Sequence, residues 1–151
     1  MIEVLPANYS AVLLDTNVLS ELMRARPDAA VLAWFEQQSG VTFYTSAITQ
    51  AEIFLGIALL PAGKRREALA AAADLMFEEE FAMHCLPFDA AAASEYALLV
   101  AARTRIGHAI STEDALIAAI AIQHQMPLAT RNTKDFLDIG QLKLINPWVT
   151  N

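Results

Sequence analysis

A short apolar run that stops at three polar residues constrains the fold of this chain more than any other feature. Residues 11–14 are Ala, Val, Leu and Leu, the next three are Asp15, Thr16 and Asn17, and apolar residues then return at helical spacing. This pattern predicts a buried strand, a tight polar turn and a helix. A strand that is apolar on both faces is typical of the middle of a parallel sheet covered by helices.

Asp15 is the first polar residue beyond the carboxyl end of that predicted strand. Ligands of open parallel sheets bind beyond the carboxyl ends of the strands, so we expect a functional site built around Asp15. Asp, Thr and Asn are also good helix caps. On this stretch alone, a purely structural role for Asp15 therefore stays open.

The rest of the chain alternates between predicted strands and predicted helices. Apolar and β-branched runs predict further strands at 41–45, 84–86, 127–130 and 142–145. Helical spacing predicts helices at about 18–23, 31–40, 46–60, 64–81, 89–105 and 115–125, with a short helix near 131–136. The alternation predicts an α/β fold with three α/β/α layers and a central, mostly parallel sheet of about five strands. No linker interrupts it, so we expect one domain over residues 1–151.

Composition limits the classes of protein to which the chain can belong. The apolar fraction is 56%, above the usual ~45–50%, yet no stretch approaches the ~18 apolar residues of a membrane span. The first residues lack the features of a secretory signal, and there is a single cysteine, so we expect a cytoplasmic protein without a membrane association. The net charge of −7 argues against a nucleic-acid binder with a basic face, but not against an enzyme whose acids surround metal ions.

The surplus of apolar residues predicts a surface that a partner covers, either a second copy or another protein. The residues expected to contribute lie on the predicted helices: Leu19, Leu22, Met23, Phe54, Leu55, Leu59, Leu60, Leu75, Met76 and Phe77.

Three further carboxylates, Glu52, Asp114 and Asp135, lie at or near predicted helix starts, just as Asp15 does. Each also fits the spacing of a capping box, which explains the acids singly. The capping partners would be Thr49, Ser111 and Asn132.

The loops after successive parallel strands gather at one edge of the sheet, so we expect Asp15, Glu52 and Asp135 to converge there. The helix that leads into the fourth strand would bring Asp114 to the same place. Clustered carboxylates cannot all stay ionised without compensation, and a hard divalent cation provides it. Oxygen ligands suit Mg²⁺ or Mn²⁺.

Four segments, in this order, resemble the motifs of PIN-domain proteins, and in particular the VapC/FitB-type toxins of bacterial toxin–antitoxin pairs. The segments span nearly the whole chain: residues 13–22, 46–53, 110–119 and 130–136. The resemblance implies a Mg²⁺-dependent endoribonuclease in which Asp15, Glu52, Asp114 and Asp135 form the acidic pocket, with Asp15 and Asp114 foremost as metal ligands. Glu113, beside Asp114, is a second candidate at that position.

The resemblance also implies supporting roles for nearby hydroxyls and amides, and it implies partners. The supporting residues are Thr16, Asn17, Thr130 and Asn132. Four basic residues flank the motifs and are candidates for contacts to RNA: Arg24, Arg26, Arg131 and Lys134. The implied partners are an RNA substrate, a second copy in a homodimer, and an antitoxin whose apolar segment enters a groove. Operator DNA would be reached only through the antitoxin.

Two alternatives stay open from the residues. A phosphatase of the haloacid-dehalogenase type also begins with a strand and an Asp, but it would need a second Asp where this chain has Asn17. The other alternative is a non-catalytic binding module whose acids only cap helices. Metal binding separates this module from the two enzymes, and the cleaved substrate separates the enzymes from each other.

Overall fold

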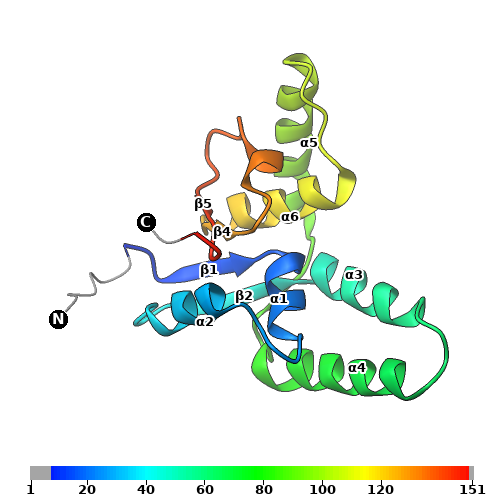
Figure 1. The fold of residues 1–151 in the computed structure, drawn as a ribbon. Helices are drawn as coiled ribbons and strands as arrows, with labels where there is room; N and C mark the ends of the chain where they lie inside the picture. Colours follow the sequence, from blue (N-terminus) through cyan, green and yellow to red (C-terminus); the bar gives the residue numbers. More distant parts are fainter. Residues whose placement is uncertain (1–7, 150–151) are drawn as a thin grey trace.

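The computed structural model describes residues 8–149 and contains a five-stranded sheet in which all the pairings are parallel (Figure 1). The strand order is β3-β2-β1-β4-β5. The strands are β1 (Ala11–Leu14), β2 (Thr42–Ser46), β3 (Cys85–Leu86), β4 (Leu128–Ala129) and β5 (Leu144–Ile145). β1 is central, as its apolar sequence predicted, with β2 on one side and β4 on the other.

Helices fill the connections between the strands. They are α1 (Thr16–Leu22), α2 (Ala29–Glu36), α3 (Ala47–Ala58), α4 (Lys64–Leu75), α5 (Ala90–Arg105) and α6 (Thr112–Gln123). Two shorter elements are the π-helix η1 (Met76–Glu80) and the 3₁₀-helix η2 (Thr133–Phe136). These bounds confirm the predicted alternation of strands and helices.

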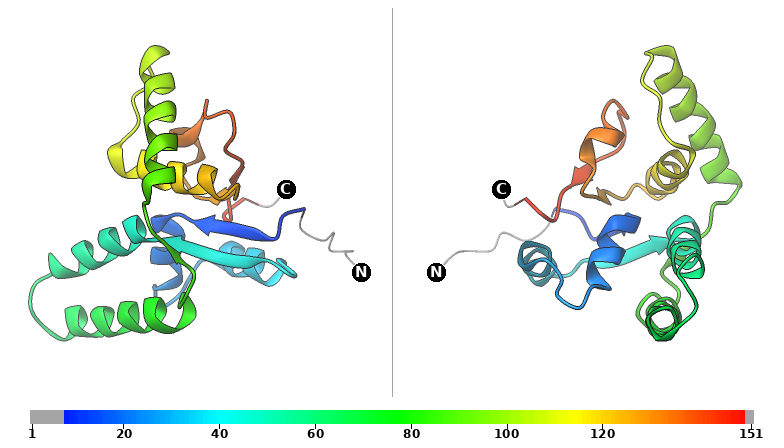
Figure 2. Two further views of the ribbon diagram at one scale, coloured as in Figure 1. Left: turned by 180° about the vertical axis from the view of Figure 1, so that it is seen from behind. Right: turned by 45° about the vertical axis from the view of Figure 1, so that its right-hand side comes forward.

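The side chains of β1 alternate between two buried clusters, one on each face of the sheet. Leu13 packs in the cluster that contains Leu99 of α5 and Ile117 of α6. Val12 and Leu14 pack in the other cluster, with residues of α1, α3, α4 and η1. In both views of Figure 2, α5 and α6 lie on the opposite side of the sheet from α4. The three-layer α/β/α fold predicted from the sequence is therefore confirmed.

The predicted helix over 64–81 is not a single α-helix. α4 ends at Leu75, and the chain continues as the π-helix η1, whose wider turn changes the direction of the side chains that follow. Met76, Phe77 and Phe81 are buried there, and the Phe77 ring lies 5.5 Å from that of Phe54.

This packing corrects part of the predicted apolar surface. Leu19, Met76 and Phe77 belong to the core and contribute nothing to an exposed patch. Leu55, Leu59 and Leu75 are exposed, and they lie on α3 and α4, which form the hairpin that extends away from the sheet (Figure 1).

Across residues 8–149, no helix is both long enough and apolar enough to span a membrane.

Candidate active site

The strand order places a crevice at the carboxyl ends of β1 and β4. The chain leaves β1 toward β2 on one side of the sheet and later returns to β4 on the other side, so β1 and β4 flank the point where the order reverses. Ligands of open parallel sheets bind at such a point. Asp15 directly follows β1 and Thr130 directly follows β4, and the Asp15 backbone N–H donates to the Ala129 carbonyl at 2.9 Å.

Asp15 is a buried carboxylate, 5% exposed, with three hydrogen-bond donors around it. Its Oδ1 accepts from the Thr16 backbone N–H at 2.8 Å, which makes Asp15 the N-cap of α1. Its Oδ2 accepts from the Thr130 hydroxyl at 2.8 Å and from the Asn17 amide at 3.4 Å. Capping accounts for Oδ1 alone, whereas the long-range bond from Thr130 fixes the other oxygen at the crevice.

Glu52 is held toward the same crevice through α1. The Thr16 hydroxyl donates to Glu52 Oε1 at 3.0 Å, and the Thr49 hydroxyl lies 3.0 Å from the Thr16 hydroxyl. The capping box predicted at Thr49 and Glu52 is wrong, because Ser46 is the N-cap of α3 and accepts from the Thr49 N–H. Glu52 therefore lies inside the helix, on the side that faces α1.

The four predicted acids are divided between two adjoining pockets. Asp15, Glu52 and Asp114 line a pocket of about 510 Å³. Asp135 lines a neighbouring pocket of about 530 Å³, and Asp114 lines that pocket too. Ser111 caps α6 by accepting from the Asp114 N–H, as predicted, whereas Asn132 makes no side-chain cap bond to η2.

Burial and mutual repulsion raise the pKa of three of these acids above their ordinary values. For Asp15 the main cause is burial, and the charges of Asp114 and Asp135 add to it while hydrogen bonds oppose it. Burial also raises the pKa of Glu52 and of Asp114, and the charge of Glu113 contributes to both. The charges of carboxyl groups from four separate parts of the fold therefore contribute to these pKa values, an effect that helix capping alone does not require.

The donor set fits a hard cation that retains water ligands. Among residues 8–149, no three histidine, cysteine, aspartate or glutamate side chains lie close enough together to hold a metal ion. Mg²⁺ usually binds through one or two carboxylates and keeps several waters. Asp15 and Asp114 line one pocket and are two such carboxylates, whereas direct ligation by three or more of the predicted acids would need the side chains to move together.

The predicted supporting residues form one network behind Asp15. The Asn17 amide donates to the Thr130 hydroxyl at 3.3 Å, and Asn17 Oδ1 accepts from the Arg131 N–H at 3.3 Å. The Asn132 N–H donates to the Thr130 hydroxyl at 3.1 Å, and the Asn132 carbonyl accepts from the Asp135 N–H at 3.0 Å. The network connects the turn after β1 to the turn after β4.

All four predicted RNA-contacting residues line pockets at or beside the acids. Arg24 and Arg131 line the pocket of Asp15, and Lys134 lines that of Asp135. Arg26 lines an adjacent apolar pocket of about 960 Å³. Arg24 also pairs with the buried Glu21 at 3.1 Å, so part of its role is structural.

Three residues contribute to the site without having been predicted there, and Thr49 was expected only as a helix cap. Thr49 is fully buried beside Thr16, Glu21 accepts from the Asp28 N–H at 2.9 Å, and Trp148 lies under the Arg131 guanidinium, 5.1 Å from ring centroid to Cζ. Their positions depend on contacts between distant segments, so only the fold reveals them.

Comparisons with known proteins bear on the whole chain. The PIN domain family model matches residues 12–142. VapC ribonuclease Y4jK of Sinorhizobium fredii is 45% identical over 137 residues, which cover 91% of this chain and 97% of that protein. Toxin FitB of Neisseria gonorrhoeae is 39% identical over 137 residues, covering 91% and 98%. A solved structure of FitAB bound to an IR36 DNA fragment superposes with a TM-score of 0.84 at 39% identity, covering 93% of this chain and 97% of that one.

Proposed function

The chain belongs to the PIN-domain family, and on that premise we propose that it is a Mg²⁺- or Mn²⁺-dependent endoribonuclease acting as the toxin of a toxin–antitoxin pair. Residues 1–151 would form one PIN-like domain. The main supporting observation is the carboxylate of Asp15, which is buried at the strand-order reversal and accepts from Thr130 at the end of the adjacent strand β4. Glu52 and Asp114 line the same pocket.

Asp15 and Asp114 would hold the ion, and Glu52 and Asp135 would act through its water ligands. When bound, the ion supplies Lewis-acid polarisation of a phosphate oxygen and lowers the pKa of water. The chain's own hydrogen bonds keep the ligands in place: Thr130 fixes Asp15 Oδ2, and Thr16 fixes Glu52. This arrangement directs lone pairs into the pocket without further side-chain ordering.

Basic and aromatic residues around the pocket would hold the RNA. Arg131 and Arg24 line the pocket with the acids and offer guanidinium groups to phosphates. Trp148 lines the same pocket, and its ring lies under the Arg131 guanidinium, which it would hold in place for a phosphate. These contacts offset the acidic character of the chain where the backbone of the RNA would approach.

An antitoxin segment would occupy the 960 Å³ pocket between α1, α3 and α4. Its lining is mostly apolar, with Ile53, Ile57 and Leu60 from the α3 side, and it shares Thr16 and Glu52 with the acidic pocket. An apolar segment bound there would end beside the carboxylates. The net charge of −7 attracts a basic partner to the chain as a whole, whereas the lining of this pocket contains Arg24, Arg26 and Arg65 against a single acid, Glu52. Operator DNA would be bound by the antitoxin.

The test is cleavage of RNA by the purified chain without a partner. We expect cleavage in Mg²⁺ or Mn²⁺, none in excess EDTA, and a loss of at least about 100-fold in Asp15→Asn and in Asp114→Asn, the scale of loss expected when a metal ligand or its support is removed. Asp15→Asn keeps a side chain that can cap α1, and Ser111 still caps α6 in Asp114→Asn.

Asp89→Asn is the matched control. Asp89 caps α5 through the Ala92 N–H at 3.0 Å and lies outside the acidic pocket, so its variant should cleave as the wild type does. Cleavage by Asp15→Asn at the wild-type rate would contradict the ligand role. Hydrolysis of a phosphomonoester in place of RNA would return the haloacid-dehalogenase alternative.

A further inference from the structure

Arg103 is a buried cation that the acidic site does not explain. It lies in the last turn of α5 and is 5% exposed. Among the ion pairs of residues 8–149, none involves Arg103. A buried charge without a counter-ion is costly unless hydrogen bonds compensate it. The burial of this guanidinium therefore depends on the hydrogen bonds that it makes.

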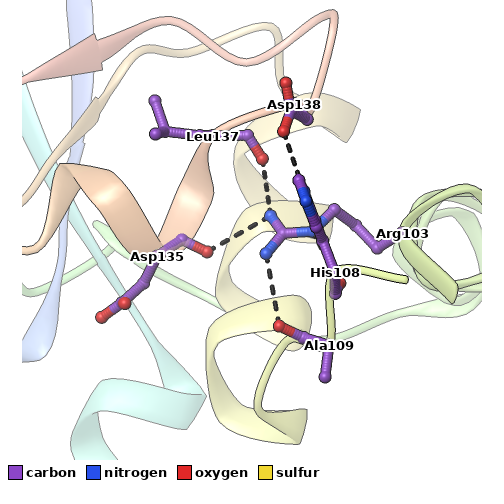
Figure 3. Close-up of polar contacts among 6 residues, drawn as sticks. All are labelled: Arg103, His108, Ala109, Asp135, Leu137 and Asp138. Atoms are coloured by element: carbon purple, nitrogen blue, oxygen red, sulfur yellow. Dashed lines mark hydrogen bonds and ion pairs between the residues drawn. The ribbon is translucent and has the colours of Figure 1, made fainter. Parts of the chain in front are cut away.

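Four backbone carbonyls supply the compensation, and Figure 3 shows the bonds to those of Ala109, Asp135 and Leu137. Nε donates to the His108 carbonyl at 2.9 Å, and Nη2 donates to that of Ala109 at 3.3 Å. Nη1 donates to the carbonyls of Asp135 and Leu137 at 3.3 and 2.6 Å. In Figure 3 the Asp135 carboxylate points away from the guanidinium, so Arg103 holds the backbone of Asp135 and leaves its side chain free for the site.

The carbonyls belong to two segments, and each segment positions one acid. His108 and Ala109 lie in the loop that leads to Ser111, the cap of α6, whose first turn contains Asp114. Asp135 is itself the acid of η2. The fork of the guanidinium therefore connects the segment that ends at Asp114 to the segment that contains Asp135.

A second and weaker connection joins the same two segments at the surface. His108 Nδ1 lies 3.0 Å from Asp138 Oδ2, and both side chains are more than half exposed. Arg103 therefore makes the buried connection between the two segments, and His108 makes the exposed one.

We propose that Arg103 is a positioning residue that sets the separation of the Asp114 and Asp135 carboxylates for metal binding. The inference rests on the proposed function, because it concerns the same ion. Lysine does not substitute for arginine here, because its ammonium is a point donor and cannot reach both segments with a planar fork. Supporting groups of this kind change metal affinity by about 10–100-fold when they are altered.

The experiment measures Mn²⁺ binding to the full chain without RNA, by electron paramagnetic resonance of the free ion, together with the melting temperature in EDTA. We expect Arg103→Lys to bind Mn²⁺ about tenfold more weakly than wild type. Arg105→Lys is the matched control, because Arg105 lies in the same turn of α5 but is exposed, and its Mn²⁺ affinity should equal that of wild type.

A coupling measurement separates positioning from general stability. In an Asp135→Asn background, Arg103→Lys should weaken Mn²⁺ binding less than it does in wild type, because the two residues act through one acid. Equal Mn²⁺ affinity of Arg103→Lys and wild type would overturn the inference, even if the variant melts earlier. Additive losses in the double variant would also overturn it.

His108→Ala decides the matter if Arg103→Lys does not fold. This variant removes only the exposed connection to Asp138, so it should remain folded and bind Mn²⁺ about two- to threefold more weakly, a small fraction of the usual cost of altered support. It also removes the hydrogen bond to the Asp138 carboxylate and so frees an oxygen ligand beside the pocket, a change that would favour cation binding. Unchanged or stronger binding would therefore overturn the inference. If the wild type binds no Mn²⁺, the proposed function is overturned as well. If the wild type binds Mn²⁺, the comparison with the variants tests the role of Arg103 alone.

Discussion

Lowering the pH from about 7 to about 5 should stabilise the metal-free protein. Burial raises the pKa of Asp15, Glu52 and Asp114 above their ordinary values of 3.8, 4.5 and 3.8. An acid whose pKa is higher in the folded state holds its proton more tightly there. The free energy of unfolding therefore rises as the pH falls through the folded pKa, and the gain is complete below the unfolded pKa.

The size of the effect follows from burial. Each extra proton bound by the folded state changes the free energy of unfolding by about 1.4 kcal/mol per pH unit. Asp15 is buried, so it can contribute up to that slope, whereas water screens the half-exposed Glu52 and Asp114 and reduces theirs. For a chain of this size, the slope from Asp15 alone corresponds to at most about 3–6 °C in melting temperature per pH unit.

The assay is thermal unfolding in EDTA at half-unit steps from about pH 7 to about pH 4.5, a range that spans the expected titration of the raised carboxyls. Hydrogen bonds lower the pKa of Asp89, so protonation of Asp89 reduces the free energy of unfolding instead of raising it. That loss occurs below the ordinary pKa of 3.8, outside the pH range of the assay. Asp15→Asn should flatten the curve, and Asp89→Asn should leave it unchanged. A melting temperature that falls on acidification, or parallel curves for Asp15→Asn and wild type, would refute the raised pKa of Asp15 in the folded state.

Two further predictions concern RNA and assembly. Arg131→Ala should raise the KM for RNA cleavage several-fold with little change in kcat, because Arg131 lines the pocket without contacting the acids' side chains. Lys143→Ala, at a different pocket, should change neither constant. An unchanged KM in Arg131→Ala would rule out the contact between Arg131 and RNA. Light scattering over a dilution series should give a dimer for the chain alone, since Leu55, Leu59 and Leu75 are exposed on the hairpin of α3 and α4. It should give a larger complex when a small basic partner that suppresses cleavage is added. A monomer at every concentration would contradict the dimer.

The sequence predicted the elements whose signals are local. The run before Asp15 is apolar at every position, and the structure places Val12 and Leu14 on one face and Leu13 on the other. The acid-bearing turns also follow from local sequence, because parallel strands bring their carboxyl ends together. The order of the strands, and with it the pairing of Asp15 with Thr130, needed the fold.

Long-range packing decided what the sequence did not predict. Met76 and Phe77 were expected at a surface, yet the π-turn of η1 directs them into the core. Arg103 sits among charged residues at a helix end, where a solvated side chain is the ordinary expectation, and its burial depends on carbonyls up to 34 residues away. Thr49 has the spacing of a cap, but Ser46 takes that role and frees Thr49 to pack against Thr16.

The most direct test of the metal site is anomalous diffraction from crystals of the partner-free chain grown with Mn²⁺. We expect one peak or a pair of peaks in the pocket of Asp15, with the Asp15 and Asp114 carboxylates at metal–oxygen bonding distance and the peak lost in Asp114→Asn. No peak in that pocket, or a peak bound only by residues outside it, would contradict the proposed metal site.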